Sequence, residues 1–186
     1  MNNTLVFLRH AATKKDKEIP VSEWILTEEG KDDALKLIDD EYLLDFDVII
    51  TSTEKKAYQT AKPLADKLGK EIRQIKELSE LNRDSGELMT KEEYDKMKVK
   101  IFEDMNYTDF GWETTQHALD RFKKAVDKVE KEYDGKKILI VAHGTVMTLY
   151  FAFLQNKLDS LMEGWKGVGF CDYGIVKNNQ VVKDIV

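Results

Sequence analysis

The chain has 186 residues and a formal net charge of −6, with 42% hydrophobic and 34% charged residues. These values are ordinary for a soluble globular domain, and the negative charge argues against a nucleic-acid or membrane-surface partner, since both need a positive field. The single cysteine, Cys171, excludes an intramolecular disulfide and a cysteine-based zinc site. The apolar run near the N-terminus is too short for a signal peptide or a membrane span, so we expect a cytoplasmic protein with one domain over residues 1–186.

The first half of the chain predicts three strands and two helices. Short apolar runs typical of buried strands occupy residues 4–8, 48–50 and 72–75. The spacing of apolar residues predicts a helix over about 27–42, with Thr27 as its N-cap. A second helix is expected over about 54–68, where Gly69 ends it and Pro63 kinks it or removes one hydrogen bond.

The second half continues the alternation of helix and strand. Helices are expected at residues 90–105 and 113–133, a strand at 137–142, a helix of about ten residues ending at Leu154, and a hairpin of residues 169–176 and 180–185. Such alternation is typical of a parallel sheet covered by helices on both faces. The sequence therefore predicts a three-layer α/β/α fold with a mostly parallel central sheet.

Three of the expected strands end in residues suited to chemistry: Arg9-His10, Thr51-Ser52 and His143. In open α/β sheets, ligands bind outside the carboxyl ends of the strands. A lone histidine at such a place is commonly structural. Here two of the three histidines in the chain stand at strand ends, one of them beside an arginine, and this pattern favours a catalytic site.

Six segments carry further motifs, in chain order. They are Leu8-Arg9-His10-Ala11-Ala12-Thr13, Leu26-Thr27-Glu28-Glu29-Gly30, Thr51 to Ala61, Leu78-Ser79-Glu80-Leu81, Glu113 with Arg121, and Val141-Ala142-His143-Gly144. In order, they resemble L-R-H-G-x-T, L-T-x-x-G, S-x-x-x-R-A-x-x-T-A, L-x-E, G-E-S with a later arginine, and V-x-H-G. These are motifs of the histidine phosphatase superfamily, also called phosphoglycerate-mutase-like. The resemblance covers most of the chain and implies the phosphatase branch of that family.

The residue types suit phosphoryl transfer to His10, since a neutral imidazole is a good nucleophile near pH 7. Arg9 offers a planar fork to two phosphate oxygens, and a protonated His143 adds charge at the same place. The resemblance implies that Glu80 protonates the leaving group and then activates water. Neither step requires a metal ion or a cofactor.

The sequence departs from the family motifs at two positions. Ala11 replaces the glycine that follows the nucleophile, and its methyl group can narrow the pocket. Lys56 replaces the second phosphate-binding arginine and loses its bidentate geometry. Arg83 can compensate if its guanidinium enters the pocket; the alternative is an ordinary surface arginine. The predicted phosphate-binding residues are Arg9, Thr13, Lys56, Arg83, His143 and Gly144.

The predicted substrate is a phosphorylated small molecule or a phosphoprotein. Hydrolysis of a phosphomonoester is the favoured activity, and a phosphohistidine or phosphoprotein phosphatase is the alternative enzyme. A phosphate-binding module with impaired turnover is the third reading, suggested by Ala11 and Lys56. Mutase activity is not expected, because the segments that hold a phosphoglycerate carboxylate are not found. Residues 86–112 form a predicted helical insertion near the site, whose aromatic residues either wall a pocket or pack on the core.

Overall fold

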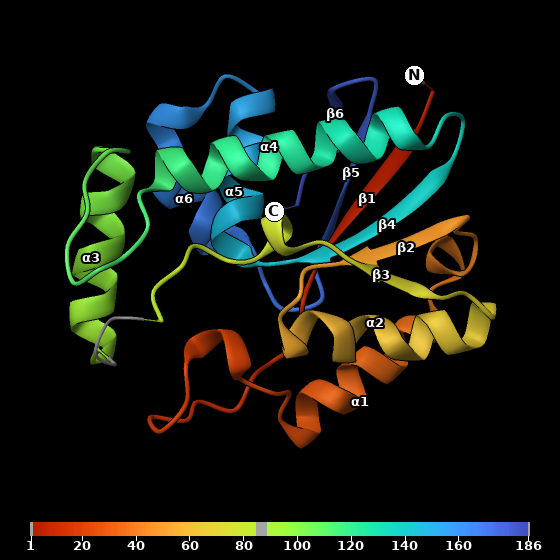
Figure 1. Ribbon diagram of the computed structural model, residues 1–186, viewed down its shortest axis with the longest axis horizontal. Coiled ribbons are helices and arrows are strands. Elements are labelled where there is room, and N and C mark those ends of the chain that lie inside the picture. The colour runs from red at the N-terminus through yellow and green to blue at the C-terminus, as the bar shows by residue number, and fades with distance from the viewer. Residues whose placement is uncertain (1, 85–88, 186) are drawn as a thin grey trace.

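The computed structural model describes residues 2–84 and 89–185 and is built on a six-stranded sheet in the order β3-β2-β4-β1-β5-β6 (Figure 1). The strands are β1 (Thr4–Arg9), β2 (Val48–Thr51), β3 (Ile72–Gln74), β4 (Lys137–Ala142), β5 (Tyr173–Lys177) and β6 (Gln180–Lys183). The first four strands pair in parallel with one another, while β5 pairs antiparallel with β1, and β6 with β5. The sheet is therefore mostly parallel, as predicted, and its antiparallel edge is the predicted C-terminal hairpin.

Helices cover both faces of this sheet. α1 (Glu28–Lys36) and α2 (Lys55–Leu68) lie on one face, and α4 (Thr115–Glu132) and α5 (Gly144–Leu154) lie on the other (Figure 1). The alternation of side chains along β1 explains the two layers, because Val6 and Leu8 pack towards α2 while Leu5 and Phe7 pack towards α4 and α5. All four side chains are buried. The predicted three-layer α/β/α fold is confirmed.

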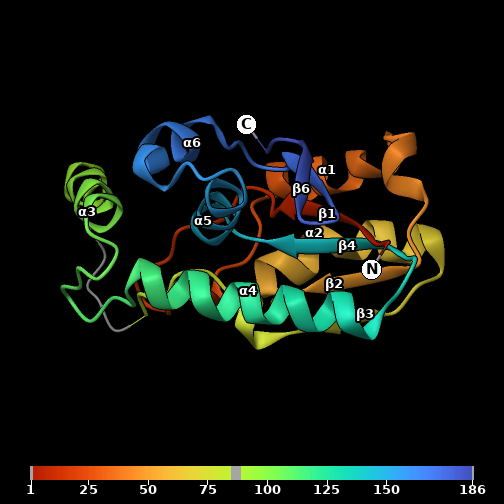
Figure 2. The same cartoon turned by 90° about the horizontal axis from the view of Figure 1, so that it is seen from above.

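α3 (Lys91–Glu103) and α6 (Leu161–Gly167) lie beyond the sheet, where α6 packs on α5 and α3 packs on α6 (Figure 2). α3 begins with a capping box in which the side chain of Thr90 accepts from the N–H of Glu93 and the Glu93 carboxylate accepts from the N–H of Thr90. Its position matches the predicted helix at 90–105. Residues 86–88 of the predicted insertion lie outside the described residues.

Two helices differ from the prediction. The first helix ends at Lys36 instead of continuing to Tyr42, because Asp40 starts a new turn by accepting a hydrogen bond from the N–H of Tyr42. α6 was not predicted, since it has only seven residues and includes Gly164 and Gly167, which are poor helix formers. Short 3-10 helices complete the chain at Val21–Glu23, Leu37–Asp39, Glu41–Leu44, Lys76–Leu78 and Leu158–Ser160.

Gly30 shows why one motif requires glycine. A Cβ atom at this position would lie 2.2 Å from the carbonyl oxygen of Ala12, far inside van der Waals contact. That same carbonyl accepts from the N–H of Thr27 at 3.0 Å, and the Thr27 side chain caps α1 by accepting from the N–H of Gly30 at 2.9 Å. The start of α1 is therefore held tightly against the loop that follows β1.

Of the helices within residues 2–84 and 89–185, none combines the length and the apolar character needed to cross a bilayer.

Candidate active site

His10 directly follows β1 at the carboxyl end of the sheet, and only 6% of its surface is exposed. Its main-chain N–H donates to the carbonyl of Ala142 at 3.1 Å, and its ring Nδ1 lies 2.7 Å from the carbonyl oxygen of Ala11. A carbonyl only accepts, so Nδ1 carries the hydrogen in this contact and Nε2 keeps its lone pair. Burial, followed by the charges of His143 and Lys56, holds the pKa of His10 well below its ordinary value. The imidazole is therefore neutral near pH 7.

His143 directly follows β4 as the N-cap of α5 and is fully buried, with its ring centroid 5.1 Å from that of His10. Its Nε2 lies 2.7 Å from Oγ of Ser52 and 3.5 Å from Oε1 of Glu54. Its Nδ1 has no hydrogen-bond partner among the described residues. Burial, followed by the charge of Lys56, holds the pKa of His143 well below its ordinary value. The protonated form therefore requires additional negative charge in the site.

Arg9 is the last residue of β1 and reaches the N-terminus of α5. Its Nη1 donates to the carbonyl of Val168 at 2.5 Å, and its Cζ lies 4.4 Å from the ring centroid of Phe170. A Cβ atom on Gly144 would lie 3.2 Å from the Cζ and the Nε of Arg9. The glycine therefore allows the guanidinium to approach the helix N-terminus, where both favour an anion.

Glu80 binds the first turn of α5 through its carboxylate. Its Oε2 accepts from the N–H of Thr145 at 3.0 Å, and its Oε1 accepts from the N–H of Val146 at 3.3 Å. Burial raises the pKa of Glu80, but the charges of Lys98 and His143 and these hydrogen bonds outweigh it and hold the pKa well below its ordinary range. Glu80 is therefore a carboxylate in the free protein.

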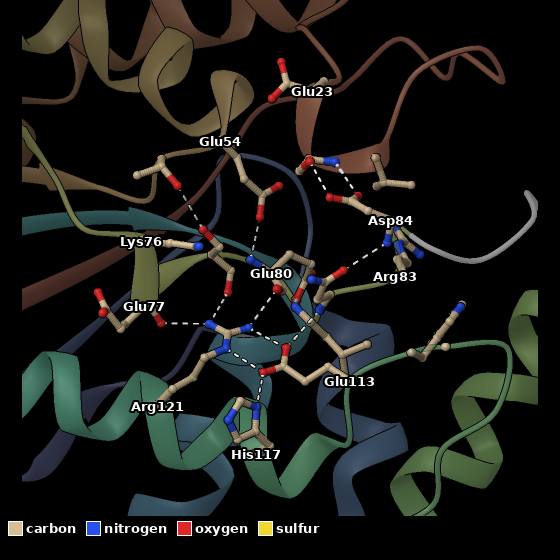
Figure 3. Close-up of a pocket in the computed structure, with 18 residues that line it drawn as sticks. Glu23, Glu54, Lys76, Glu77, Glu80, Arg83, Asp84, Glu113, His117 and Arg121 are labelled. Carbon is tan, nitrogen blue, oxygen red and sulfur yellow. Dashed lines mark hydrogen bonds and ion pairs between the residues drawn. The ribbon is translucent and has the colours of Figure 1, made fainter.

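Arg121 of α4 fixes the main chain at Glu80 and just before it (Figure 3). Its guanidinium donates to the carbonyls of Glu77 and Ser79 at 2.7 Å and to that of Glu80 at 2.8 Å. It also binds both carboxylate oxygens of Glu113, at 2.7 and 2.8 Å. Glu113 and Arg121 thus support the segment that carries Glu80.

Lys56 of α2 reaches the site but is already engaged. Its Nζ donates to the carbonyl of Val21 at 2.8 Å and is ion-paired with Glu54, and both side chains are buried. Burial raises the pKa of Glu54, and the charge of Lys56 opposes this shift. Oε1 of Glu54 also accepts from the N–H of Glu80 at 2.6 Å. A buried carboxylate therefore links the lysine to the segment of the predicted acid.

The predicted site residues surround a cavity of about 250 Å³. Those that line it are Arg9, His10, Thr13, Lys56, Glu80, Arg83 and Gly144, while the fully buried His143 lies behind His10. The Cζ of Arg83 lies 4.9 Å from the ring centroid of Tyr94 and 5.7 Å from that of Trp112, which also line the cavity. Trp24, Trp165 and Phe170 complete an aromatic wall. Glu80 and Arg83 also border a second cavity of about 790 Å³ (Figure 3).

Ala11 does not narrow this cavity. Its side chain is fully buried and packs with Leu26 and Ala34, and its main-chain N–H donates to Oγ1 of Thr60 at 3.0 Å. Its φ angle is not in the left-handed region, so a glycine is not needed there.

Sequence reasoning missed Glu54 and Lys98. Both lie in segments rich in lysine and glutamate, where a solvent-exposed face is the usual structure. A weak signal existed for Lys98, because it stands next to Met97 and one helical turn before Phe102, on the side of α3 that packs inwards. Within the described residues, no cluster of three or more His, Cys, Asp or Glu side chains is arranged to hold a metal ion.

Together, the fold and the paired histidines and carboxylate around one cavity define an α/β protein built to handle phosphate groups. Residues 5–168 match the histidine phosphatase superfamily (branch 1), and the chain belongs to this family. A relative from Bacillus subtilis (strain 168), named uncharacterized phosphatase PhoE, is 34% identical over 109 residues, which cover 58% of this chain and 53% of the relative. The chain therefore spans about half the length of the curated relative it matches.

Solved structures with the same fold include YhfR of Bacillus stearothermophilus, with a TM-score of 0.79 and 25% identity over 97% of this chain and 95% of that one. A phosphoserine phosphatase mutant from Entamoeba histolytica, solved with phosphoserine, also has a TM-score of 0.79, with 19% identity over 97% and 94%. A mycobacterial glucosyl-3-phosphoglycerate phosphatase has a TM-score of 0.77, with 21% identity over 94% and 90%. At such low identity the last two support the fold alone.

Proposed function

We propose that this protein hydrolyses phosphate monoesters through a phosphohistidine on His10, without a metal ion or a cofactor. The observation that carries the proposal is the state of His10 in the cavity. Its Nδ1 is bonded to a carbonyl and its imidazole is neutral, which leaves Nε2 as a nucleophile. Arg9 and the N-terminus of α5 supply positive potential for the phosphoryl oxygens.

In the first step, Nε2 of His10 attacks the phosphorus atom and the bond between phosphorus and the ester oxygen breaks. The electron pair of that bond goes to the leaving oxygen, which takes a proton from the Glu80 carboxyl group. The approaching phosphate raises the local negative charge, which favours protonation of both Glu80 and His143. Thr13, Lys56, Arg83 and Gly144 are the further proposed contacts of the phosphoryl group.

In the second step, the Glu80 carboxylate takes a proton from water and the water oxygen attacks the phosphorus atom. The bond between phosphorus and Nε2 breaks and its electron pair returns to His10. Glu80 then gives its proton to the departing inorganic phosphate, which restores the resting carboxylate. Arg121 keeps the Glu80 segment in place through both steps, by its bonds to the carbonyl groups of Glu77, Ser79 and Glu80.

The aromatic wall of the cavity favours a small phosphorylated molecule over a phosphoprotein. A volume of about 250 Å³ holds a phosphoryl group and a compact leaving group. Residues 89–112 of the predicted insertion supply part of the wall, including Met89, Tyr94 and Trp112. We propose that this segment selects the leaving group. That several structural neighbours are named for small phosphorylated metabolites agrees with this choice.

The test is hydrolysis of an aryl phosphate and an alkyl phosphate in excess EDTA. His10→Ala should lower kcat by more than about 1000-fold, while His117→Ala, which changes an exposed histidine, should leave it unchanged. Glu80→Gln should slow the alkyl ester by roughly 100-fold or more and the aryl ester much less, because an aryl oxide leaves without a proton. An acid-labile phosphoprotein should form in the wild type and be lost in His10→Ala.

Full activity in His10→Ala would contradict the proposal, and so would a complete loss of wild-type activity in EDTA. A folded wild type that binds inorganic phosphate in calorimetry and hydrolyses no ester would favour the phosphate-binding module. Turnover of a phosphohistidine peptide and of no small ester would favour the protein phosphatase.

A further inference from the structure

Lys98 is a buried lysine that the proposed steps do not use. It lies on α3 with 1% of its surface exposed, although lysine is almost never fully buried unless its charge is compensated. Its Nζ donates to Oγ1 of Thr145 at 2.5 Å. It also lies 5.3 to 5.4 Å from the ring centroids of Tyr94, Phe102 and Trp165. A lysine buried in this way is expected to serve a function in the site next to it.

Thr145 connects this lysine to the predicted acid. Its side chain accepts from Lys98, and its main-chain N–H donates to Oε2 of Glu80 at 3.0 Å. Lys98 does not line the cavity; Tyr94, Thr145 and Trp165, which do line it, separate the ammonium group from the cavity. Lys98 therefore acts on the site through Thr145, which lines the cavity.

The other charged groups around Glu80 interact mainly with other parts of the site. Arg9 from β1 lines the cavity, His143 at the start of α5 lies next to His10, and Arg121 from α4 binds the Glu80 main chain and Glu113. Glu54 adds a negative charge on the side of α2 and is paired with Lys56 there.

The groups around Lys98 are equally few. Burial lowers the pKa of Lys98 and the charge of Arg83 adds to this shift, while Tyr94 and Glu80 oppose it and favour the charged form. Glu80 is the carboxylate among these groups, so it is the anion that compensates the buried ammonium charge.

We propose that Lys98 is a positioning residue for Glu80, which fixes Thr145 at the first turn of α5 and keeps the Glu80 side chain a carboxylate in the resting enzyme. This inference rests on the proposed function for the role of Glu80. It has a consequence for the substrate. Because the resting carboxylate carries no proton, the proton for the leaving group arrives with the ester as its monoanion, whose further ionisation has a pKa near 6.

The test compares three substitutions at one position. Lys98→Met removes the charge and fills the space between the surrounding aromatic rings. Lys98→Gln removes the charge but keeps a donor for Thr145, and Lys98→Arg keeps the charge. Lys96→Met is the matched control, because Lys96 lies on the same helix, 70% exposed and paired with Glu92. The first readout is the titration of the Glu80 carboxyl carbon by NMR, assigned with Glu80→Gln.

In the wild type, Lys96→Met and Lys98→Arg, Glu80 should remain ionised down to the acid unfolding of the protein. In Lys98→Met and Lys98→Gln, it should titrate at least about one pH unit higher. Because Glu80 stays ionised above acid unfolding in the wild type, an acid limb of kcat/KM set by its protonation should appear only in Lys98→Met and Lys98→Gln. Two neutral variants are used so that one that fails to fold does not end the test.

Equal titration of Glu80 in the wild type and in a folded neutral variant would overturn the inference. The NMR readout needs no turnover, so it separates this failure from a failure of the proposed function, which the His10→Ala assay reports. If kcat falls in Lys98→Met but no acid limb of kcat/KM appears, Lys98 has only a packing role, and that result too would overturn the inference.

Discussion

Arg121→Met should destabilise the protein far more than an ordinary surface substitution. The guanidinium donates five hydrogen bonds, three to carbonyl groups and two to the Glu113 carboxylate. The side chains of Arg121 and Glu113 are only 17% and 9% exposed. Removing one partner of a buried ion pair costs about 3–5 kcal/mol, because the other charge loses its compensation. Since this pair retains some contact with water, we expect the lower end, about 3 kcal/mol.

Urea and thermal unfolding of the variant measure this loss. In a protein of this size, 1 kcal/mol corresponds to roughly 2–4 °C in Tm, so the expected decrease is about 6–12 °C. Arg73→Met is the control, because the pair of Arg73 and Glu132 is 37% and 41% exposed and should contribute less than about 1 kcal/mol. Equal losses in the two variants would refute the reasoning. Arg121→Lys should recover little, because lysine cannot reproduce the planar fork that binds Glu113.

Three further outcomes follow from the same structure. The free energy of unfolding should decrease as pH falls below about 6.5, because His10 and His143 take up protons in the unfolded chain but not in the folded protein. The expected loss is about 2 kcal/mol at pH 5.5. Urea midpoints of the double variant His10→Asn/His143→Asn should not show this loss. Gly30→Ala should cost roughly 1–3 kcal/mol in urea unfolding, since its Cβ would overlap a carbonyl oxygen in the loop after β1. Gly144→Ala should raise KM for an aryl phosphate with little loss of stability, because its Cβ would press on the flexible guanidinium of Arg9.

The sequence predicts the fold well because its strands are short apolar runs and its helices have clear caps. Thr27 and Thr90 mark helix starts where the structure has them, and Gly69 ends α2 in the left-handed conformation. The predictions that failed are local ones. Where Asp40 caps a new turn, a hydrogen bond between neighbours overrides the apolar stripe that suggested a longer helix.

The site residues likewise fall into those that the sequence predicts and those that it does not. Motif spacing selects His10, Glu80 and His143 because each follows or precedes a regular element at a fixed distance, and the sheet then brings them to one edge. Lys98 has no such marker. A lysine in a charged helix is normally solvated, and only the packing of α3 against α6 and the start of α5 buries this one.

Glu54 changes how the replacement of arginine by Lys56 should be understood. An arginine at this place could bind a carboxylate with one edge of its fork and a phosphate with the other, whereas lysine presents one ammonium group. If Lys56 binds the phosphoryl group as proposed, that group shares the ammonium with Glu54, and each weakens the interaction of the other with Lys56. The same carboxylate lies 3.5 Å from Nε2 of His143 and can compensate the charge of that ring once a phosphate favours its protonation. The exchange at Lys56 is thus not an isolated loss of affinity. It is coupled to a buried glutamate two residues earlier, which is paired with the lysine and lies close enough to the second histidine to stabilise its protonated form.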